Sequence, residues 1–384
     1  MKQWCQLGFL CPAVMAAAAA LNFALSFKSL DWLAFRTWEA AVSVECPSGI
    51  GPFEPDQVYR KDRAYGDLAN IGNMADMRQY RREEFTVDRF GFRNDRPLKD
   101  VHPVGFVIGD SFTAGAGISD DDTLPEQLTR DAGGFFYNAG AVTGDLAKAE
   151  VVSSTLHLSK GTVVYELLER TARNGPSSLE ARKPDCAEQF WASTKVARAA
   201  TLFASDHSPG VLLSRKFVKA VENDYWQPNP YRLEVARRKL QNGQEVLFYR
   251  YDMRPLRDEQ KLTTEWRSYF EDLRQRMARR NLQLVVLVVP DKYTVYGPLL
   301  EERPGDSGGE RLLAAIEQEL RKTDIPVVNL TQKFRAAAAA VLSRNQYIYW
   351  RDDTHWNPLG IKLAAASLWS ELQQARPVTS ANSD

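Results

Sequence analysis

Histidine and cysteine are scarce in this chain, and neither sign of charge prevails. Four of each occur among 384 residues, without the close spacing that metal sites use. Lys plus Arg number 49, as do Asp plus Glu, so neither a basic surface for nucleic acid nor an acidic tail is indicated. Internal repeats and a glycine-rich phosphate loop are also absent from the sequence. We therefore predict no metal, no cofactor and no nucleic-acid partner.

Charge is also missing from residues 4–27, which include the run Ala16–Ala20. A helix of 24 residues rising ~1.5 Å per residue can cross a hydrocarbon core of ~30 Å. A cleavable signal peptide has a shorter apolar stretch of about 7–15 residues. We predict that residues 1–28 anchor the chain in the inner membrane as a single-pass segment, with the catalytic part in the periplasm or otherwise outside the cytoplasm. Cleavage near Ala24 is the alternative.

The remaining cysteines outside that apolar run are Cys46 and Cys186. In an exported domain, a single pair of this kind is a candidate disulfide. The sequence leaves open whether the two meet.

From residue 104 onward, apolar runs alternate with helical patterns. The predicted strands are Val104–Ile108, Phe135–Gly140, Thr162–Leu168, Leu282–Pro290 and Ile325–Leu330. Predicted helices cover residues 121–132, 144–158 and 357–373. The run at 282–290 is unbroken, and a strand with two apolar faces is typical of a parallel sheet covered by helices on both sides. We predict a doubly wound α/β domain.

The segments around this pattern differ from it in composition. Residues 29–100 are predicted to be an irregular polar lead-in, with one short strand before a turn at Gly91. The catalytic domain is expected over 101–375, with an insertion at about 175–260. That insertion is too long for a plain loop and is predicted to be lid-like. Residues 376–384 are expected to be a disordered tail.

A candidate nucleophile follows the first strand, in the sequence Gly109-Asp110-Ser111. Ligands of α/β sheets bind at the carboxyl ends of strands, so a serine on this turn presents its hydroxyl to that space. Gly109 permits a tight bend there. The alternative is a turn serine that merely caps the next helix.

A candidate base lies near the other end of the chain, in "YWRDDTHWNPLG". A serine hydroxyl is a weak nucleophile until a base such as His355 takes its proton, and that base needs an acid to orient it. Asp352 and Asp353 both lie close enough along the chain. The alternative is an exposed loop histidine beside two solvated carboxylates.

Taken together, "GDSFTAGAG" and "DDTHWNPLG" resemble the first and last blocks of the SGNH (GDSL-like) hydrolase superfamily. The resemblance covers about residues 100–370, apart from the insertion. It implies a flavodoxin-like, three-layer α/β/α fold, with Ser111 as nucleophile and His355 as base. The implied chemistry is deacylation or acyl transfer on small esters or glycans.

Two further blocks complete the comparison with that superfamily. "NAGAVTGD" is similar to the second block, which implies that Gly140 and Ser111 lend N–H groups to the oxyanion hole. The third block normally contains Gly-x-Asn-Asp, whereas this chain has "VVYELLERTARNG". Asn174 is the candidate side-chain donor, although Glu166 and Glu169 lie nearer the expected position.

The strings "VVYELLER", "VVPDKYTVYGPLL" and "DTHW" resemble the branch that contains the alginate O-acetylation proteins. That branch implies Asp353 as the orienting acid, with Asp352 as the alternative. Its members place the Asp–His pair before the serine, whereas here the serine comes first. Arg170, Lys292 and Tyr296 are predicted to bind substrate, the alternative for Lys292 and Tyr296 being ordinary packing.

The resulting prediction is a serine esterase or O-acyltransferase that acts on O-acyl groups, chiefly O-acetyl, of a cell-envelope or exported polysaccharide. A polysaccharide-export complex would be its setting. The alternative is a non-catalytic SGNH-like module that binds glycan within such a complex. The sequence does not separate hydrolase from transferase, because the two share a nucleophile.

Overall fold

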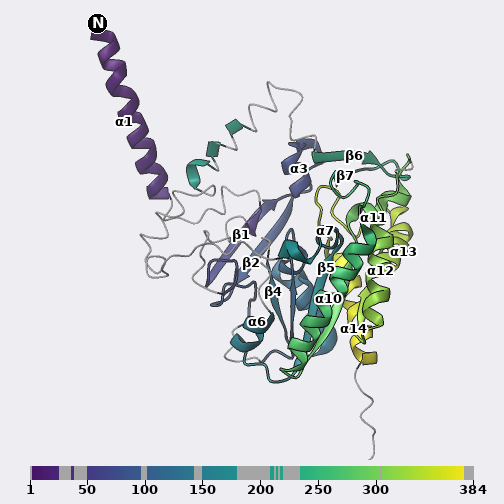
Figure 1. Cartoon of the computed structure of the whole chain (residues 1–384). Helices are drawn as coiled ribbons and strands as arrows, with labels where there is room; N and C mark the ends of the chain where they lie inside the picture. The colour runs from purple at the N-terminus through teal and green to yellow at the C-terminus, as the bar shows by residue number, and fades with distance from the viewer. Residues whose placement is uncertain are drawn as a thin grey trace, which may run out of the picture.

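A five-stranded parallel sheet forms the centre of the computed structural model (Figure 1). The structure describes residues 2–25, 36–38, 50–96, 102–141, 149–179, 208–211, 213–214, 217–218, 234–302 and 305–375. The strands are β3 (Gly105–Gly109), β4 (Phe136–Gly140), β5 (Gly161–Leu168), β8 (Leu282–Val289) and β9 (Val327–Asn329). Their order in the sheet is β4-β3-β5-β8-β9, which is the flavodoxin-like order 2-1-3-4-5. The predicted parallel α/β sheet is therefore confirmed.

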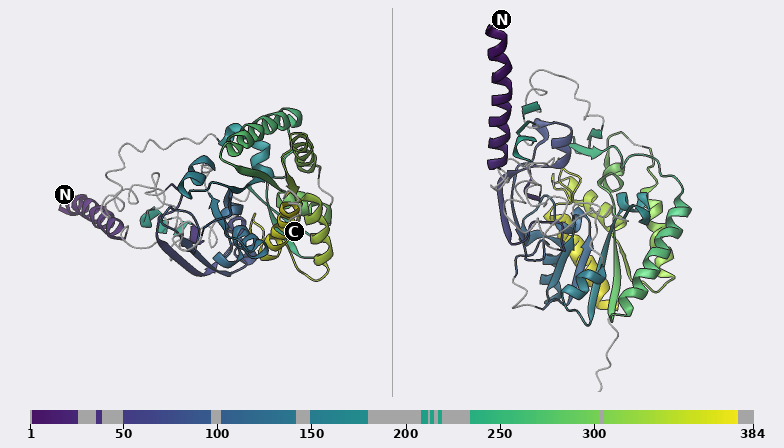
Figure 2. Two further views of the ribbon diagram at one scale, coloured as in Figure 1. Left: turned by 90° about the horizontal axis from the view of Figure 1, so that it is seen from below. Right: turned by 60° about the vertical axis from the view of Figure 1, so that its left-hand side comes forward.

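Helices cover both faces of this sheet, as the views in Figure 2 show. On one face lie α5 (Leu124–Ala132), α13 (Thr331–Leu342) and α14 (Pro358–Ala375). On the other lie α6 (Ala149–Thr155), α10 (Glu259–Ala278) and α12 (Gly309–Arg321). Alternate residues of β8 enter the two cores: Val285 and Leu287 pack in the first, Val286 and Val288 in the second. The uninterrupted apolar run thus serves two helical layers.

Short helices follow the carboxyl ends of three of these strands. β3 leads into α4 (Ser111–Ala114), β5 into α7 (Glu169–Asn174), and β8 into α11 (Lys292–Tyr296). 3-10 turns follow at Pro176–Leu179 and Gly297–Leu299. This edge of the sheet therefore gathers the predicted site residues Ser111, Arg170 and Lys292.

Residues 50–96, the described part of the predicted irregular lead-in apart from 36–38, contain regular elements, among them the predicted short strand before Gly91. β1 (Gln57–Ala64) pairs antiparallel with β2 (Arg81–Val87). Between them lie α3 (Asp67–Ile71) and the 3-10 turn Ala75–Met77. Tyr59 and Phe85 of the hairpin share an apolar cluster with Ala114 of α4. The hairpin is thereby fixed beside the serine turn, a long-range contact that no local pattern in 29–100 reveals.

Part of the predicted insertion is also regular. β6 (Val235–Lys239) and β7 (Glu245–Tyr249) form an antiparallel hairpin, and Leu247 packs with Leu68 and Ala69 of α3. This end of the 175–260 region therefore packs against α3, which lies between β1 and β2. Residues 180–207 and most of 208–233, which the lid prediction also covers, lie outside the described residues.

The N-terminal apolar segment forms helix α1 (Lys2–Leu25), which contains Pro12. Among the described residues, no helix combines the length and apolarity needed to span a membrane. Cys46 and Cys186, for which the sequence leaves a disulfide open, and the tail 376–384 lie outside the described residues.

Candidate active site

The turn after β3 presents Ser111 at the start of α4. Asp110 caps this helix, because its Oδ1 accepts a hydrogen bond from the Phe112 N–H at 2.9 Å. Capping by Asp110 leaves the Ser111 hydroxyl available for another partner. Gly109 is required by close packing, since a Cβ there would come within 2.3 Å of Glu166 Oε2 and Thr113 Oγ1. Within the described part of the chain, no hydrogen bond uses the Ser111 N–H.

The hydroxyl meets the imidazole predicted from the far end of the chain. Ser111 Oγ lies 2.8 Å from His355 Nε2, and His355 Nδ1 lies 2.6 Å from Asp353 Oδ1. The His355 N–H also donates to Asp353 Oδ1, at 3.2 Å. The ring of Phe112 packs beside the imidazole, with centroids 4.8 Å apart. Serine, histidine and aspartate therefore form a continuous hydrogen-bonded chain with triad geometry.

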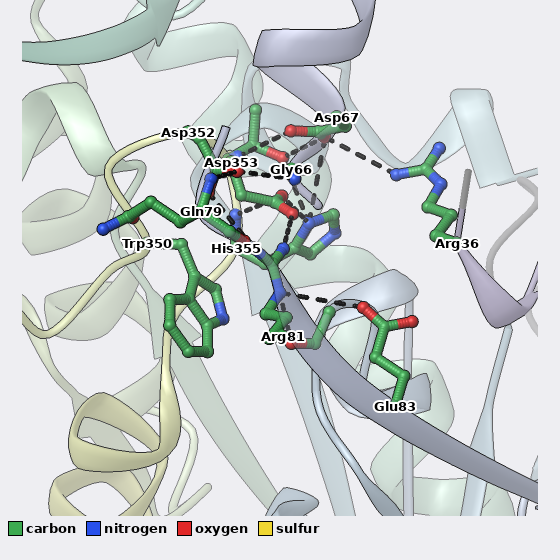
Figure 3. A network of polar contacts seen from close by, with 12 residues as sticks. Arg36, Gly66, Asp67, Gln79, Arg81, Glu83, Trp350, Asp352, Asp353 and His355 are labelled. Carbon is green, nitrogen blue, oxygen red and sulfur yellow. Dashed lines mark hydrogen bonds and ion pairs between the residues drawn. The ribbon is translucent and has the colours of Figure 1, made fainter. Parts of the chain in front are cut away.

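Arg81 binds the far side of the Asp353 carboxylate. Its Nη2 donates to Asp353 Oδ2 at 2.6 Å (Figure 3). Burial opposes ionisation of Asp353, but the charge of His355, their hydrogen bond and Arg81 hold its pKa well below the ordinary value. Asp353 is thus kept as the anion that a triad requires.

Asp352, the alternative orienting acid, faces away from the imidazole. Its Oδ2 accepts hydrogen bonds from the backbone N–H groups of Gly66 at 2.7 Å and Gln79 at 2.8 Å. Its Oδ1 accepts from Arg81 Nη1 at 3.1 Å. Burial raises the pKa of Asp352. The geometry therefore places Asp353 in the orienting position. Asp352 instead connects the histidine loop to the backbone between β1 and β2.

Sequence reasoning missed Arg81 and Asp67, which both contact this loop from residues expected to be irregular. A weak signal exists for the arginine. On the strand pattern of β2, Arg81 shares a face with Phe85 and Val87, which are buried. A guanidinium on the buried face of a strand requires carboxylate partners. No comparable signal marks Asp67, whose hydrogen-bond partner Thr354 lies 287 residues away in the sequence.

The predicted oxyanion donors other than Ser111 do not fit that role in the structure. The Gly140 N–H donates to Asn138 Oδ1 at 2.9 Å, and a Cβ at Gly140 would meet Ala114 N at 2.3 Å. Gly140 is therefore explained by close packing of β4 on α4. Asn174 is exposed at the end of α7, where its Oδ1 accepts a hydrogen bond from the Tyr251 hydroxyl.

Lys292 and Tyr296 are structural rather than substrate-facing, which corrects the prediction for both. Lys292 is 2% exposed, and its Nζ donates to the carbonyl oxygens of Leu247, Trp350, Arg351 and Asp353 at 2.7–3.0 Å. Burial lowers the pKa of Lys292 to about 7. Tyr296 is also buried, and its hydroxyl accepts from the Ile348 N–H at 2.9 Å. Both side chains bind backbone groups of residues 348–353 and so support the loop that leads to His355.

Arg170, the third predicted substrate residue, keeps partial exposure but is already paired. Its Nε and Nη2 bind the two oxygens of Asp252 at 2.8 and 2.9 Å. Its Nη2 also lies 3.7 Å from Asp291 Oδ1. One quarter of its side chain remains exposed. A role in substrate binding stays a prediction for this residue.

Asp67, Asp353 and His355 are the described residues whose donor atoms lie close enough together to hold a metal ion. Those atoms are already used within the protein. His355 Nδ1 binds Asp353, Asp353 binds Arg81, and the Asp67 oxygens accept from Thr354. A metal would have to displace these contacts, so the three residues fit a hydrogen-bonded network within the protein better than a metal centre.

Comparisons with known proteins point to the same superfamily. Residues 243–383 match the family described as "SGNH hydrolase-like domain, acetyltransferase AlgX". The chain is 27% identical over 173 residues to a probable alginate O-acetylase AlgJ of Pseudomonas putida. It is 25% identical over 153 residues to the protein of that name from Azotobacter vinelandii. The resemblance to an AlgX/AlgJ-like branch of the SGNH superfamily is confirmed.

These matches are partial. They cover 41% and 39% of this chain and 43% and 38% of the two relatives, so the chain spans less than half the length of either. Among solved structures, similar chains include an acetyl xylan esterase, AlAXEase, at 12% identity and TM-score 0.35. It is covered over 98% of its length and covers 69% of this chain. A putative arylesterase from Agrobacterium tumefaciens str. C58 has 11% identity and TM-score 0.32, covering 71% of this chain and 99% of its own. Likenesses of this size carry no argument about function.

Proposed function

We propose that this protein is a serine esterase or O-acyltransferase that uses Ser111, His355 and Asp353 on O-acyl groups, chiefly O-acetyl, of a polysaccharide. The observation that carries the proposal is the pair of contacts at His355, 2.8 Å to Ser111 Oγ and 2.6 Å to Asp353 Oδ1. The AlgX-like match and the two alginate O-acetylase relatives support acetyl-ester chemistry on a glycan.

The proposed reaction begins when Ser111 Oγ attacks the ester carbonyl carbon while His355 Nε2 takes the hydroxyl proton. The carbonyl electrons form an oxyanion, and the Ser111 N–H is the described donor available to it. When the intermediate collapses, the bond to the alcohol oxygen breaks and His355 returns the proton to that oxygen. Water or a sugar hydroxyl then attacks the acyl-serine, with His355 again moving the proton. Asp353 stabilises the imidazolium in both halves.

The proposal is tested by hydrolysis of p-nitrophenyl acetate and of acetylated oligosaccharides. Ser111→Ala is expected to lower kcat by on the order of 10⁴ or more, because removing a triad nucleophile leaves only binding and oxyanion contributions. Ser119→Ala is a matched control, since that serine bonds to β2 rather than to the imidazole. Equal activity of Ser111→Ala and the unchanged protein would refute the catalytic proposal and favour the glycan-binding alternative.

Hydrolase and transferase are separated by adding an acceptor to the same assay. If acyl transfer prevails, unacetylated oligosaccharide raises p-nitrophenol release and yields acetylated sugar by mass spectrometry. A pure esterase releases acetate at an unchanged rate. Location outside the cytoplasm and membership of an export complex stay predictions, which fractionation of cells and co-purification with export proteins would test.

A further inference from the structure

A second carboxylate lies beside the imidazole, and the proposed mechanism does not use it. Asp67 Oδ2 is 3.8 Å from His355 Nδ1, on the same ring nitrogen that Asp353 binds at 2.6 Å. Figure 3 shows both carboxylates turned toward the imidazole, Asp67 from α3 and Asp353 from the C-terminal loop. Asp67 is 8% exposed. The ring nitrogen therefore faces two buried acids from opposite ends of the chain.

Asp67 is fixed in this position by contacts with the catalytic loop. Its Oδ1 accepts from the Thr354 N–H at 2.8 Å, and its Oδ2 accepts from the Thr354 hydroxyl at 2.7 Å. The neighbouring Gly66 can carry no side chain, because a Cβ would lie 2.0 Å from the Asp352 carbonyl oxygen. The Ala69 N–H donates to that same oxygen at 3.0 Å. The first turn of α3 is thus docked directly on the loop that carries the histidine.

Cationic side chains lie beside both acids, although on balance burial and Asp353 raise the pKa of Asp67. Arg36 Nη1 lies 3.8 Å from Asp67 Oδ2, while Arg81 neutralises Asp353 on its far side. Burial and the nearby Asp353 raise the pKa of Asp67, and His355 and Arg36 oppose that rise. Among the described residues, the charged groups that interact with the two acids include Arg36, Arg81, Arg170, Lys292, Asp352 and His355.

We propose that Asp67 is a positioning residue for His355, acting as a second carboxylate that stabilises the imidazolium and holds Thr354 between the two acids. The proposal rests on the proposed function of His355 as the base. When Nε2 takes the serine proton, the positive charge on the ring interacts with Asp353 through a hydrogen bond and with Asp67 across the longer distance. If Asp353 is removed, Asp67 remains as the nearest carboxylate to Nδ1, so the two acids share one task.

A test that needs no turnover measures the pKa of His355 directly. Histidine ring signals of the full chain are titrated by NMR, with His355→Gln used to assign the signal among four histidines. Loss of a nearby negative charge disfavours the imidazolium, so Asp67→Asn is expected to lower the His355 pKa by about half a unit or more. Thr354→Ser keeps the hydroxyl that contacts Asp67 Oδ2 at 2.7 Å and His355 Nδ1 at 3.3 Å, and it is expected to leave that pKa unchanged. An unshifted titration in Asp67→Asn would overturn the proposal even if the enzyme proves active.

A kinetic cycle tests the shared task. Asp67→Asn alone is expected to lower the rate of ester hydrolysis by less than about fivefold. In the Asp353→Ala background, the same substitution is expected to lower the remaining rate by at least about tenfold. Thermal melting confirms that each variant is folded. If the effects of the two substitutions simply multiply, Asp67 acts independently of Asp353 and the proposal fails. Absence of any Ser111-dependent activity would instead count against the proposed function, while the NMR titration still decides the role of Asp67.

Discussion

The turn that carries Ser111 belongs to the sheet, whereas the loop that carries His355 is held by parts of the chain outside it. Ser111 follows β3, and its geometry depends on Asp110 and Gly109, its immediate neighbours. The His355 loop instead takes hydrogen bonds from Gly66, Gln79, Arg81 and Lys292. The serine turn thus depends mainly on its immediate neighbours and on Glu166 of the adjacent strand β5, whereas the histidine loop depends on residues much farther away along the chain.

This difference predicts that adjacent acids on the loop have separate effects. Asp353→Asn is expected to lower kcat by about 10²–10⁴, because the imidazole loses the anion that orients it and stabilises its charge. Asp352→Asn is the matched control, and it should change kcat by no more than about tenfold while lowering Tm. The measurement is ester hydrolysis per folded molecule. Equal kinetic losses in the two variants would mean that the loop, and not one carboxylate, is what catalysis requires.

The support behind the loop should matter mainly to stability. Lys292→Met leaves four carbonyl groups without their shared buried donor and is expected to cost about 3 kcal/mol of unfolding free energy. Lys261→Met is a control on α10, where the side chain is 72% exposed. Denaturant unfolding of both variants decides the question. A small effect at Lys292 would show that water can replace the ammonium behind the loop.

Arg81 should link stability to pH, because it helps to keep Asp353 ionised. A carboxyl with a depressed pKa stabilises the fold above its unfolded value of ~3.9, and this stability is lost as the pH falls through the folded value. Removing the guanidinium raises the pKa of Asp353 in the folded protein, so the difference between its folded and unfolded pKa values becomes smaller. Arg81→Gln should therefore begin to unfold at a higher pH on acidification and lower kcat by roughly tenfold.

Arg93→Gln offers a control for that experiment, since Arg93 is another buried arginine beside the same hairpin. It binds Asp120 and carbonyl groups of residues 84, 114, 115 and 118, and no triad member. Its loss should reduce Tm without altering the pH dependence of kcat. A parallel change in both variants would assign the effect of Arg81 to general destabilisation.

The same contrast explains what the sequence could and could not predict. The five parallel strands and Ser111 were predictable because an apolar run and the turn after it are local signals. The contact between Ser111 and His355 required the family resemblance, since 244 residues separate them. Helix α12 was not predicted, although its apolar residues recur at helical spacing in Leu312, Leu313, Ile316 and Leu320. Of the β1–β2 hairpin, the strand before Gly91 was predicted, but β1 and the pairing were missed because the hairpin packs on α4, which lies farther along the chain.

The sequence also could not predict the direction in which the Lys292 side chain points. Lys292 follows the clearest strand at the edge where ligands bind, so its position alone favoured a substrate contact. In the structure, the Lys292 ammonium on α11 points toward the backbone of the loop that carries His355. Periodicity assigns a residue to a face only within a regular element, and a five-residue helix after a strand has no such reference.

Substitution of Asn174 is expected to change kcat/KM least, and it tests whether the serine turn depends on this side chain. Its side chain is exposed and paired with Tyr251, with no contact to Ser111 or Gly140 among the described residues. Asn174→Ala is therefore expected to keep kcat/KM within about twofold, whereas loss of a true oxyanion donor costs about 10²–10³. Tyr251→Phe removes the same hydrogen bond from the other side and should match it. A hundredfold loss in Asn174→Ala alone would mean that substrate binding draws this side chain toward the serine turn, so that the nucleophile, like the base, depends on a distant residue.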